Sequence, residues 1–424
     1  MILKFLGILL YYLIHQKTQF YDEEWVSKHQ FKRLKNLLEI ASNSDYYNKL
    51  FKSIHFNVKK DFKSIEDLNK IPILCKDEVK NNPDLFLTRK PKYFDKIFYT
   101  SGSTGKPMKA YISWKHWIVE QSVIYRHWKW QGYKFRDTCG MIRSYSPKQG
   151  EPLIKYSWPL NTYYYSPFHL NDDNMKKYYN HMLIKNIKYL RGYPSSIKIF
   201  ASFCKKYDLT IPTLKFILTA SEVLNHEDRI FIEEVFNVKI GNHYGLAEQI
   251  VMFGNCGESN LLHNYNEYGY CELLATNNKN IFKIIGTNLN NDLMPLIRYD
   301  TGDLAIIDSN LKCSCNRKGL IIKNIIGRSD QIIKDSEGNK IPTVNFYTMM
   351  QYYTEILEWQ IVINKNDHFT LKYTGPKLKK QRKQEIINGL NSRLVNTNFV
   401  ISISNTDSLI KISEGKTKRI IYEK

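Results

Sequence analysis

Acidic residues are scarce in this sequence relative to basic ones. Its 424 residues include 62 Lys and Arg but only 41 Asp and Glu, which gives a formal net charge of +21. Such an excess would ordinarily indicate a nucleic acid or an anionic membrane as partner. However, the chain has no block of six like charges and no nucleic-acid-binding motif, and Lys, Asn, Ile and Tyr are frequent throughout. We therefore predict no nucleic-acid partner, and we expect the charge to attract small anionic substrates.

Cysteine is also scarce, and the seven cysteines are an odd number. Secreted domains held together by disulfides are usually short and pair their cysteines. The count in this long chain therefore favours a protein of the reducing cytoplasm.

The apolar stretch that begins the sequence is too short to span a membrane. Residues 1–14 are apolar apart from Lys4, whereas a membrane-spanning helix needs about 20 residues. No small-residue cleavage site of a signal peptide precedes residues 15–17. We expect an N-terminal helix packed on the body of the protein. Peripheral attachment to a membrane through residues 1–14 is the alternative.

The chain is long for one domain, so we expect two or three. Its 43% of hydrophobic residues is ample for their cores. Apolar spacing predicts helices over 25–41 and 115–130, a mostly apolar run predicts a buried strand at 215–220, and another short strand is predicted at 238–240.

A loop rich in Gly, Ser and Thr lies at residues 99–107, which read Tyr-Thr-Ser-Gly-Ser-Thr-Gly-Lys-Pro. The two glycines allow a tight turn, and exposed backbone N–H groups, hydroxyls and one ammonium suit a triphosphate. The residues concerned are Ser101, Gly102, Ser103, Thr104, Gly105 and Lys106. An ordinary surface turn is the alternative, since Gly and Ser are common in turns.

This loop is not a Walker A motif. Thr100 stands where that motif needs Gly, and Pro107 stands where it needs a magnesium-binding Ser or Thr. Apolar runs at 97–99 and 110–112 predict strand–loop–strand instead of strand–loop–helix.

The loop resembles the phosphate loop of the adenylate-forming superfamily, which includes acyl-CoA synthetases and nonribosomal-peptide adenylation domains. Further segments resemble this superfamily in its own order, and Gly-Tyr-Pro-Ser at 192–195 is similar to its phenylacetate–CoA ligase branch. The other matching segments are 244–248 (Tyr-Gly-Leu-Ala-Glu), 301–303 (Thr-Gly-Asp), 326–331 (Ile-Gly-Arg-Ser-Asp-Gln) and 413–419 (Ser-Glu-Gly-Lys-Thr-Lys-Arg).

The resemblance implies a nucleotide site. It implies that Tyr244 packs on adenine, that Gly245 permits close backbone approach, and that Glu248 helps to hold magnesium. A carboxylate oxygen suits Mg²⁺, although a solvated loop acid is the alternative for Glu248. Asp303 would accept hydrogen bonds from both ribose hydroxyls, because a carboxylate has two acceptor oxygens. The ATP- or AMP-binding set is completed by Ser221, Glu222, Arg328 and the residues of the phosphate loop, with Lys106 acting in catalysis beside Glu248.

The resemblance also implies a small mobile C-terminal domain. Asp330 would be the hinge, because hinges concentrate dihedral change in a few residues. Lys416 takes the position of the catalytic lysine. Lys418, two residues later, is a second candidate for that position, and a simple basic tail is the alternative. Residues 334–344 depart from the phenylacetate–CoA ligase pattern and resemble adenylate-forming proteins of capsular-polysaccharide clusters, which puts CoA as acceptor in doubt.

Four potential metal ligands lie between these motifs. Cys256 and His263 are followed some fifty residues later by Cys313 and Cys315. Four nitrogen and sulfur ligands would form a closed structural zinc site, and some members of the phenylacetate–CoA ligase branch carry such a site here. Ordinary buried thiols and a surface histidine are the alternative.

The sequence thus predicts an α/β protein. Residues 1–330 would form a large ATP- and acid-binding domain with mixed sheets and flanking helices, and 331–424 a small α+β domain carrying Lys416. The predicted function is ATP- and magnesium-dependent activation of a carboxylic acid as an acyl-adenylate, followed by acyl transfer to CoA or to an amine or hydroxyl of a sugar. The alternatives are nucleotidyl transfer that leaves AMP on the product, and a non-catalytic membrane-associated protein that retains the fold.

Overall fold

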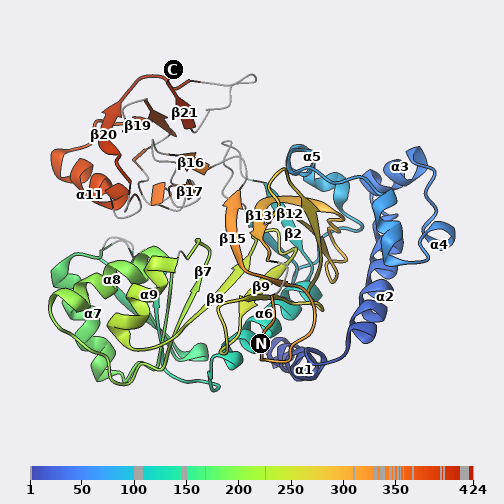
Figure 1. Cartoon of the computed structure of the whole chain (residues 1–424), viewed down its shortest axis with the longest axis horizontal. Helices are drawn as coiled ribbons and strands as arrows, with labels where there is room; N and C mark the ends of the chain where they lie inside the picture. Colours follow the sequence, from blue (N-terminus) through green and yellow to red (C-terminus); the bar gives the residue numbers. More distant parts are fainter. Residues whose placement is uncertain are drawn as a thin grey trace. The chain divides into compact units, whose positions relative to one another are not determined.

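The computed structural model divides into two compact units (Figure 1), the first formed by residues 1–100 and 108–325 and the second containing 326–424. It describes all residues except 1, 100–107, 146, 148–149, 168, 225, 309–310, 329–331, 335–339, 343–345, 347–348, 351–352, 354, 357, 365–366, 392–393, 395–396, 411–419 and 424. The predicted phosphate-loop residues 101–106, the predicted hinge Asp330 and the predicted catalytic Lys416 therefore lie outside the described residues.

A nine-stranded sheet forms the centre of the first unit. Its order is β14-β10-β9-β8-β7-β6-β3-β5-β4, and the run β5-β3-β6-β7-β8 is parallel. The strands are β3 (Cys139–Ile142), β4 (Ile154–Ser157), β5 (Thr162–Tyr165), β6 (Tyr189–Gly192), β7 (Phe216–Ala220), β8 (Ile240–Gly245), β9 (Met252–Asn255), β10 (Leu262–Asn264) and β14 (Ile321–Ile322). Every residue of β7 is buried, which confirms the buried strand predicted at 215–220.

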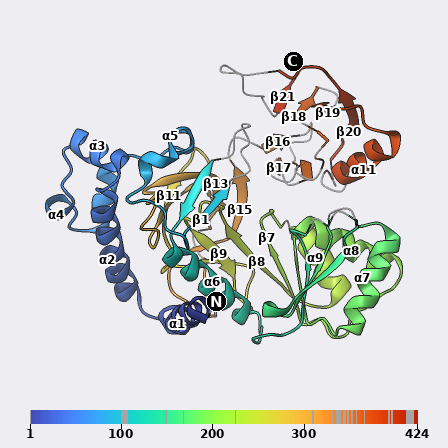
Figure 2. The same cartoon turned by 180° about the vertical axis from the view of Figure 1, so that it is seen from behind.

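Helices cover both faces of the parallel strands. One face packs against α7 (Asp172–Ile184), α8 (Pro194–Lys206) and α9 (His226–Phe236), which lie together in Figure 2. The other face packs against α6 (Trp114–Trp130), through Trp128 on the helix and Tyr189 and Leu218 on the strands. The helix predicted over 115–130 is thus confirmed.

A second, four-stranded sheet has the order β11-β12-β13-β15. Its strands are β11 (Gly269–Ala275), β12 (Ile281–Asn288), β13 (Tyr299–Ile306) and β15 (Asn324–Arg328). The register of β13 on β12 jumps, because Leu304 faces Lys283 while Asp300 faces Ile285. Residues 301–303 therefore bulge opposite a single residue, and Gly302 has the φ of +73° that such a bend needs.

The segments flanking the predicted phosphate loop form a hairpin. Strands β1 (Lys96–Tyr99) and β2 (Lys109–Ile112) pair antiparallel, with Tyr99 opposite Lys109. The strand–loop–strand arrangement predicted from the sequence is confirmed.

The remaining helices of this unit lie towards its N-terminus. They are α1 (Ile2–Thr18), α2 (Glu23–Ala41), α3 (Asp45–Ser53), α4 (Val58–Asp61) and α5 (Lys76–Asn81), with 3₁₀ turns at Ile65–Lys70, Pro83–Phe86 and Trp158–Leu160. The α2 helix predicted from apolar spacing is confirmed, and it begins where the Asp22 side chain accepts a hydrogen bond from the Trp25 N–H.

The second unit is a small α+β structure. Its four-stranded sheet has the order β20-β19-β18-β21, and helix α11 (Lys380–Asn391) packs on it through Ile386 and Leu390. The strands are β18 (Glu358–Ile363), β19 (His368–Thr374), β20 (Val400–Asn405) and β21 (Ile420–Tyr422), with a separate pair β16 (Ile332–Lys334) and β17 (Lys340–Pro342).

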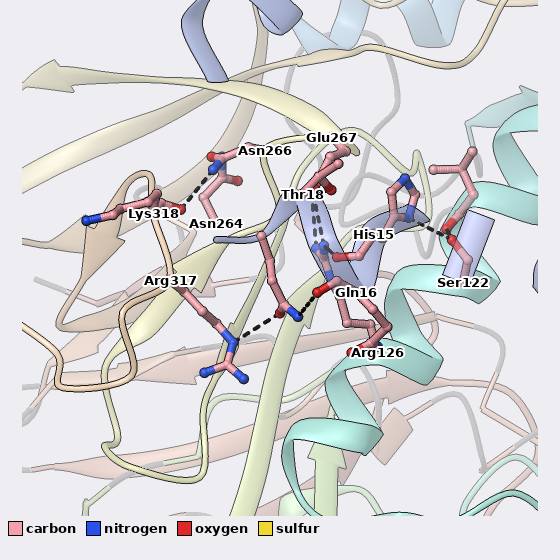
Figure 3. A network of polar contacts seen from close by, with 12 residues as sticks. His15, Gln16, Thr18, Ser122, Arg126, Asn264, Asn266, Glu267, Arg317 and Lys318 are labelled. Atoms are coloured by element: carbon pink, nitrogen blue, oxygen red, sulfur yellow. Dashed lines mark hydrogen bonds and ion pairs between the residues drawn. The ribbon is translucent and has the colours of Figure 1, made fainter. Parts of the chain in front are cut away.

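The first helix packs against α6, as expected for an N-terminal helix on the body of the protein. A network of polar contacts fixes the C-terminal end of α1 (Figure 3). Arg126 donates a hydrogen bond to the backbone oxygen of His15 at 2.8 Å, and it forms a two-pronged ion pair with Glu267 at 3.0 and 3.2 Å. The Thr18 hydroxyl also donates to Glu267, and His15 Nδ1 lies 3.0 Å from the Ser122 hydroxyl. Burial alone would raise the pKa of Glu267, but Arg126 lowers it to about 2.

The outer face of α1 exposes Leu6, Leu10 and Leu13, each more than half accessible. Within the described part of the chain, no helix has the length and hydropathy needed to cross a bilayer. Membrane attachment through this face stays a prediction.

We predict that Glu267 contributes stability that disappears in acid. Its folded pKa of about 2 lies below the ordinary value of 4.5, so the contribution, about 3 kcal/mol, is present above pH 4.5 and is lost as pH falls towards 2. Urea unfolding of wild type and Glu267→Gln should differ most near pH 7, and the difference should shrink below pH 4.5 and be smallest at about pH 2 and below. A constant difference at all pH values would contradict this account.

We also predict that Arg126→Met destabilises the protein by about 3–5 kcal/mol, because it leaves a buried carboxylate without its counter-charge. The matched control is Glu24→Gln, which breaks the exposed Lys28–Glu24 pair and should cost less than about 0.5 kcal/mol. Equal costs in the two variants would contradict the prediction.

Candidate active site

Polar side chains gather where the parallel strands end. Arg143 directly follows β3, Tyr193 follows β6, Ser221 follows β7, and Tyr244 lies at the end of β8. The carboxyl ends of parallel strands share one edge of a sheet, and ligands of open α/β sheets bind there. This edge is therefore the candidate active site.

Tyr244 and Asp303 come from the two different sheets and meet in one hydrogen bond. The Tyr244 hydroxyl donates to Asp303 Oδ2 at 2.6 Å. The bulge at 301–303 positions the acid, and its backbone N–H donates to the Thr301 hydroxyl at 3.1 Å. Burial and the Asp303 carboxylate raise the pKa of Tyr244 well above its usual value, so the phenol remains a donor. The structure thus brings together the residues predicted to hold adenine and ribose.

Glu248 is buried and already has a counter-charge. Its Oε1 atom accepts from the Lys76 ammonium at 2.8 Å and from the Tyr299 hydroxyl at 3.1 Å. An ammonium this close repels a second cation, so Glu248 fits a magnesium site only if Lys76 moves away. The predicted role of Glu248 as a magnesium ligand stays a prediction, whereas a solvated loop acid does not describe its buried position.

Ser221 and Glu222 also lie at the strand ends. Ser221 has a φ of +72°, a conformation that non-glycine residues seldom adopt and that is often found at functional sites. Its hydroxyl accepts from Arg143 Nη2 at 3.3 Å. Glu222 accepts from the Ser195 N–H at 3.0 Å, at the first turn of α8, where the helix dipole favours a negative charge. In this structure Glu222 orients α8, and direct contact with nucleotide stays a prediction.

The remaining predicted nucleotide contacts are Gly245 and Arg328. Gly245 ends β8, where an added Cβ would meet only Met252 at 3.8 Å, so protein packing alone does not require glycine. Arg328 ends β15, and its side chain lies outside the described part of the structure.

The four predicted zinc ligands come together. The ligand atoms of Cys256, His263, Cys313 and Cys315 all lie within 4.8 Å of one another. Cys256 Sγ is 3.5 Å from Cys313 Sγ, and Cys315 Sγ is 3.5 Å from His263 Nε2. The edges of a tetrahedron of sulfur and nitrogen around zinc are about 3.6–3.8 Å long, so the donor set and its spacing fit a closed structural site.

The cluster joins segments far apart in the sequence. Cys256 follows β9, His263 lies in β10, and Cys313 and Cys315 precede the edge strand β14. Burial lowers the pKa of His263 to about 4, which leaves the imidazole neutral, the form that binds metal. A metal here would fasten the connection after β13 to the edge of the large sheet.

Comparison with solved structures now identifies the fold. The chain is similar to 2-hydroxyisobutyryl-CoA ligase in its postadenylation state with 2-HIB-AMP, with a TM-score of 0.63 and 15% identity over 96% of this chain and 91% of that one. The same ligase with 2-HIB-AMP and CoA in the thioesterification state gives a TM-score of 0.61 at 16% identity over the same shares. The chain has the fold of an adenylate-forming ligase. The α/β fold class predicted from the motifs is confirmed.

One curated relative is similar to this chain in sequence. Protein CapK of Staphylococcus aureus is 25% identical over 386 residues, which cover 84% of each chain. No protein-family model matches the chain.

Sequence reasoning missed three residues of the candidate active site. Lys76 and Tyr299 hold Glu248, and Arg143 holds Ser221. Tyr299 stands two residues before the Thr-Gly-Asp segment, so its neighbourhood gave a signal. The sequence gives no such signal for Lys76. Its segment comes close to residue 299 only through the isolated β-bridge between Leu74 and Tyr299 of β13.

We predict that the purified protein holds about one zinc ion per chain. Elemental analysis should find it in wild type and in the control variant Cys75→Ser, whose thiol is exposed and outside the cluster. Cys313→Ser should lose it. Wild-type protein that takes up no zinc even when zinc is supplied would contradict the prediction.

Proposed function

We propose that this protein uses ATP to activate a carboxylic acid as an acyl-adenylate, releases pyrophosphate, and then transfers the acyl group to an acceptor. The observation that carries the proposal is the contact between Tyr244 and Asp303 at the carboxyl edge of the sheet. It joins the two residues assigned to adenine and ribose in a fold whose solved neighbour holds 2-HIB-AMP.

In the first step the substrate carboxylate oxygen attacks the α-phosphorus of ATP. The bond from that phosphorus to the bridging oxygen of the β-phosphate breaks, and pyrophosphate leaves. Two anions must approach each other, so catalysis consists mainly of positioning and charge stabilisation. Lys416 would lie between carboxylate and α-phosphate, and residues 101–106 would hold the leaving phosphates.

Asp303 would bind the ribose hydroxyls while Tyr244 orients its carboxylate. A carboxylate has about four lone-pair directions, so one hydrogen bond from Tyr244 is compatible with further donors. Magnesium, when bound, supplies positive charge to the phosphates. Since Lys76 neutralises Glu248, we assign no step to that metal through this residue.

The acceptor is either CoA or an amine or hydroxyl of a sugar. CoA is supported by the solved neighbour that contains it. A different acceptor is supported by the segment 334–344, which departs from the phenylacetate–CoA ligase pattern. In either case we propose that residues 331–424 turn about Asp330 between the two half-reactions.

We predict that Lys416→Ala lowers acid-dependent pyrophosphate release at least about a hundredfold, the usual cost of losing one transition-state contact. The assay uses ATP, magnesium and a panel of aryl, fatty, amino and dicarboxylic acids, with hydroxylamine as trap. The matched control is Lys418→Ala, which should stay within about twofold of wild type. Wild-type rates in Lys416→Ala would contradict the role, and a product that retains AMP would show nucleotidyl transfer instead.

We predict that Asp303→Asn weakens ATP binding about 10–100-fold, because it removes charge-assisted hydrogen bonds to ribose. Equilibrium binding of ATP measures the effect. Asp308→Asn is the control, since Asp308 lies beyond the end of β13 in an exposed pair with Lys323. Unchanged ATP affinity in Asp303→Asn would remove the residue from the site.

A further inference from the structure

We propose that the acid activated by this protein carries a second anionic group, which is bound by the guanidinium of Arg191 with help from Arg143. This inference rests on the proposed function, because it names the class of acid that the same edge of the sheet would take.

Arg191 lies inside the parallel sheet, one residue before the end of β6. In register it faces Met141 of β3 and Leu218 of β7. Leu190 belongs to the core beneath α7–α9, so Arg191, on the opposite side of the strand, faces α6. Its guanidinium carbon lies 3.9 Å from the ring centroid of Trp128 on that helix.

Among the described residues, Arg191 has no acidic partner, whereas the fully buried arginines have one. The arginines buried outright among the described residues each form an ion pair with a glutamate: Arg126 with Glu267, Arg229 with Glu233, and Arg298 with Glu272. Across the described residues, no carboxylate forms an ion pair with Arg191, whose polar contact is the thiol of Cys139. Charges that are largely removed from water are normally paired or bind a ligand, so this half-buried guanidinium without an acidic partner is a candidate for binding an anion from outside the chain.

A second guanidinium, that of Arg143, adds to the positive charge around Arg191. Burial lowers the pKa of Arg191, and its strongest electrostatic neighbours are Cys139, Arg143, Tyr164 and Tyr125. Burial, His127 and the two arginines lower the pKa of His243 well below its usual value, so this imidazole is neutral. The region therefore combines two like charges that an anion would neutralise.

Arg143 connects the surroundings of Arg191 to the carboxyl edge of the sheet. It donates to the hydroxyl of Ser221 at 3.3 Å, and its guanidinium carbon lies 5.1 Å from the Tyr193 ring centroid. A substrate whose reacting carboxylate lies at the strand ends would therefore extend its other end towards Arg191. Guanidinium groups recognise carboxylates and phosphates through two parallel hydrogen bonds, which suits a second acidic group on the substrate.

The test compares acids that differ only in their second group. Dicarboxylic acids of several lengths, together with phosphate-bearing acids, are paired with the half-amide or neutral analogue of each. Calorimetric binding and acid-dependent pyrophosphate release are both measured. We expect wild type to favour the dianionic member of at least one pair tenfold or more, and Arg191→Gln to lose that preference mainly through KM.

The matched control is Arg136→Gln. Arg136 also stacks on a tryptophan, with its guanidinium carbon 4.8 Å from the Trp158 ring centroid, but it is exposed. It should keep the wild-type preference. Arg191→Lys should restore part of the preference, because a charge returns without the two-pronged geometry, and unchanged ATP affinity in all variants shows that they are folded.

The outcomes separate this inference from the proposed function. Activation of neutral-ended acids without any preference, or a preference that survives Arg191→Gln, overturns the anion subsite and leaves acid activation standing. Binding of a dianionic acid that depends on Arg191 without pyrophosphate release supports the subsite and counts against acid activation. If no dianionic acid binds better than its neutral analogue, the subsite is wrong.

Discussion

The hydrogen bond between Tyr244 and Asp303 is the contact through which the two sheets of the large unit form one site. The bulge at 301–303 turns the Asp303 side chain, and Tyr244 lies where β8 ends. This polar contact links the two sheets at the place where a ligand would lie, and one shared apolar core, which includes Phe253 of the large sheet and Ile284 and Ala305 of the second, packs them together.

The arginines of this unit have different kinds of partner in different places. Enclosed cations that hold elements together are matched inside the chain, as Arg298 is by Glu272 where it also binds the backbone oxygen of Ile71. At the carboxyl edge the balance changes, because Arg143 and Arg191 have hydroxyl, thiol and aromatic neighbours instead of acids. Arginines with an acidic partner and arginines without one therefore lie in different places in this unit.

Much of the fold could be predicted from local sequence. Helix α6 and the fully buried strand β7 follow from the spacing and length of their apolar runs, and the β1–β2 hairpin follows from apolar runs on both sides of a glycine-rich loop. The meeting of Cys256, His263, Cys313 and Cys315 could be predicted as one possible grouping, because each residue type is a metal ligand.

The pairings that could not be predicted depend on distant parts of the chain. The bond from Lys76 to Glu248 spans 172 residues, and lysine is too frequent in this sequence for one of them to stand out. The position of Arg191 needs the strand register, because only the pairing with β3 and β7 shows which face of the sheet it occupies. Glu222 had a predicted role at the nucleotide, yet its described bond goes to a helix start 27 residues earlier.

The anchoring of α1 has a consequence for how the polypeptide is made. On this helix, His15 is 107 residues away from Ser122, and Thr18 is 249 residues away from Glu267. At about 5–20 residues per second, the last of these partners emerges on the order of ten to fifty seconds after the helix. Helix α6, on which α1 packs, is complete well before Glu267 is synthesised, so α1 can dock while its last polar partner is still absent. During that interval helix α1 lacks the buried ion pair between Arg126 and Glu267, so its C-terminal end is held less firmly than in the finished protein.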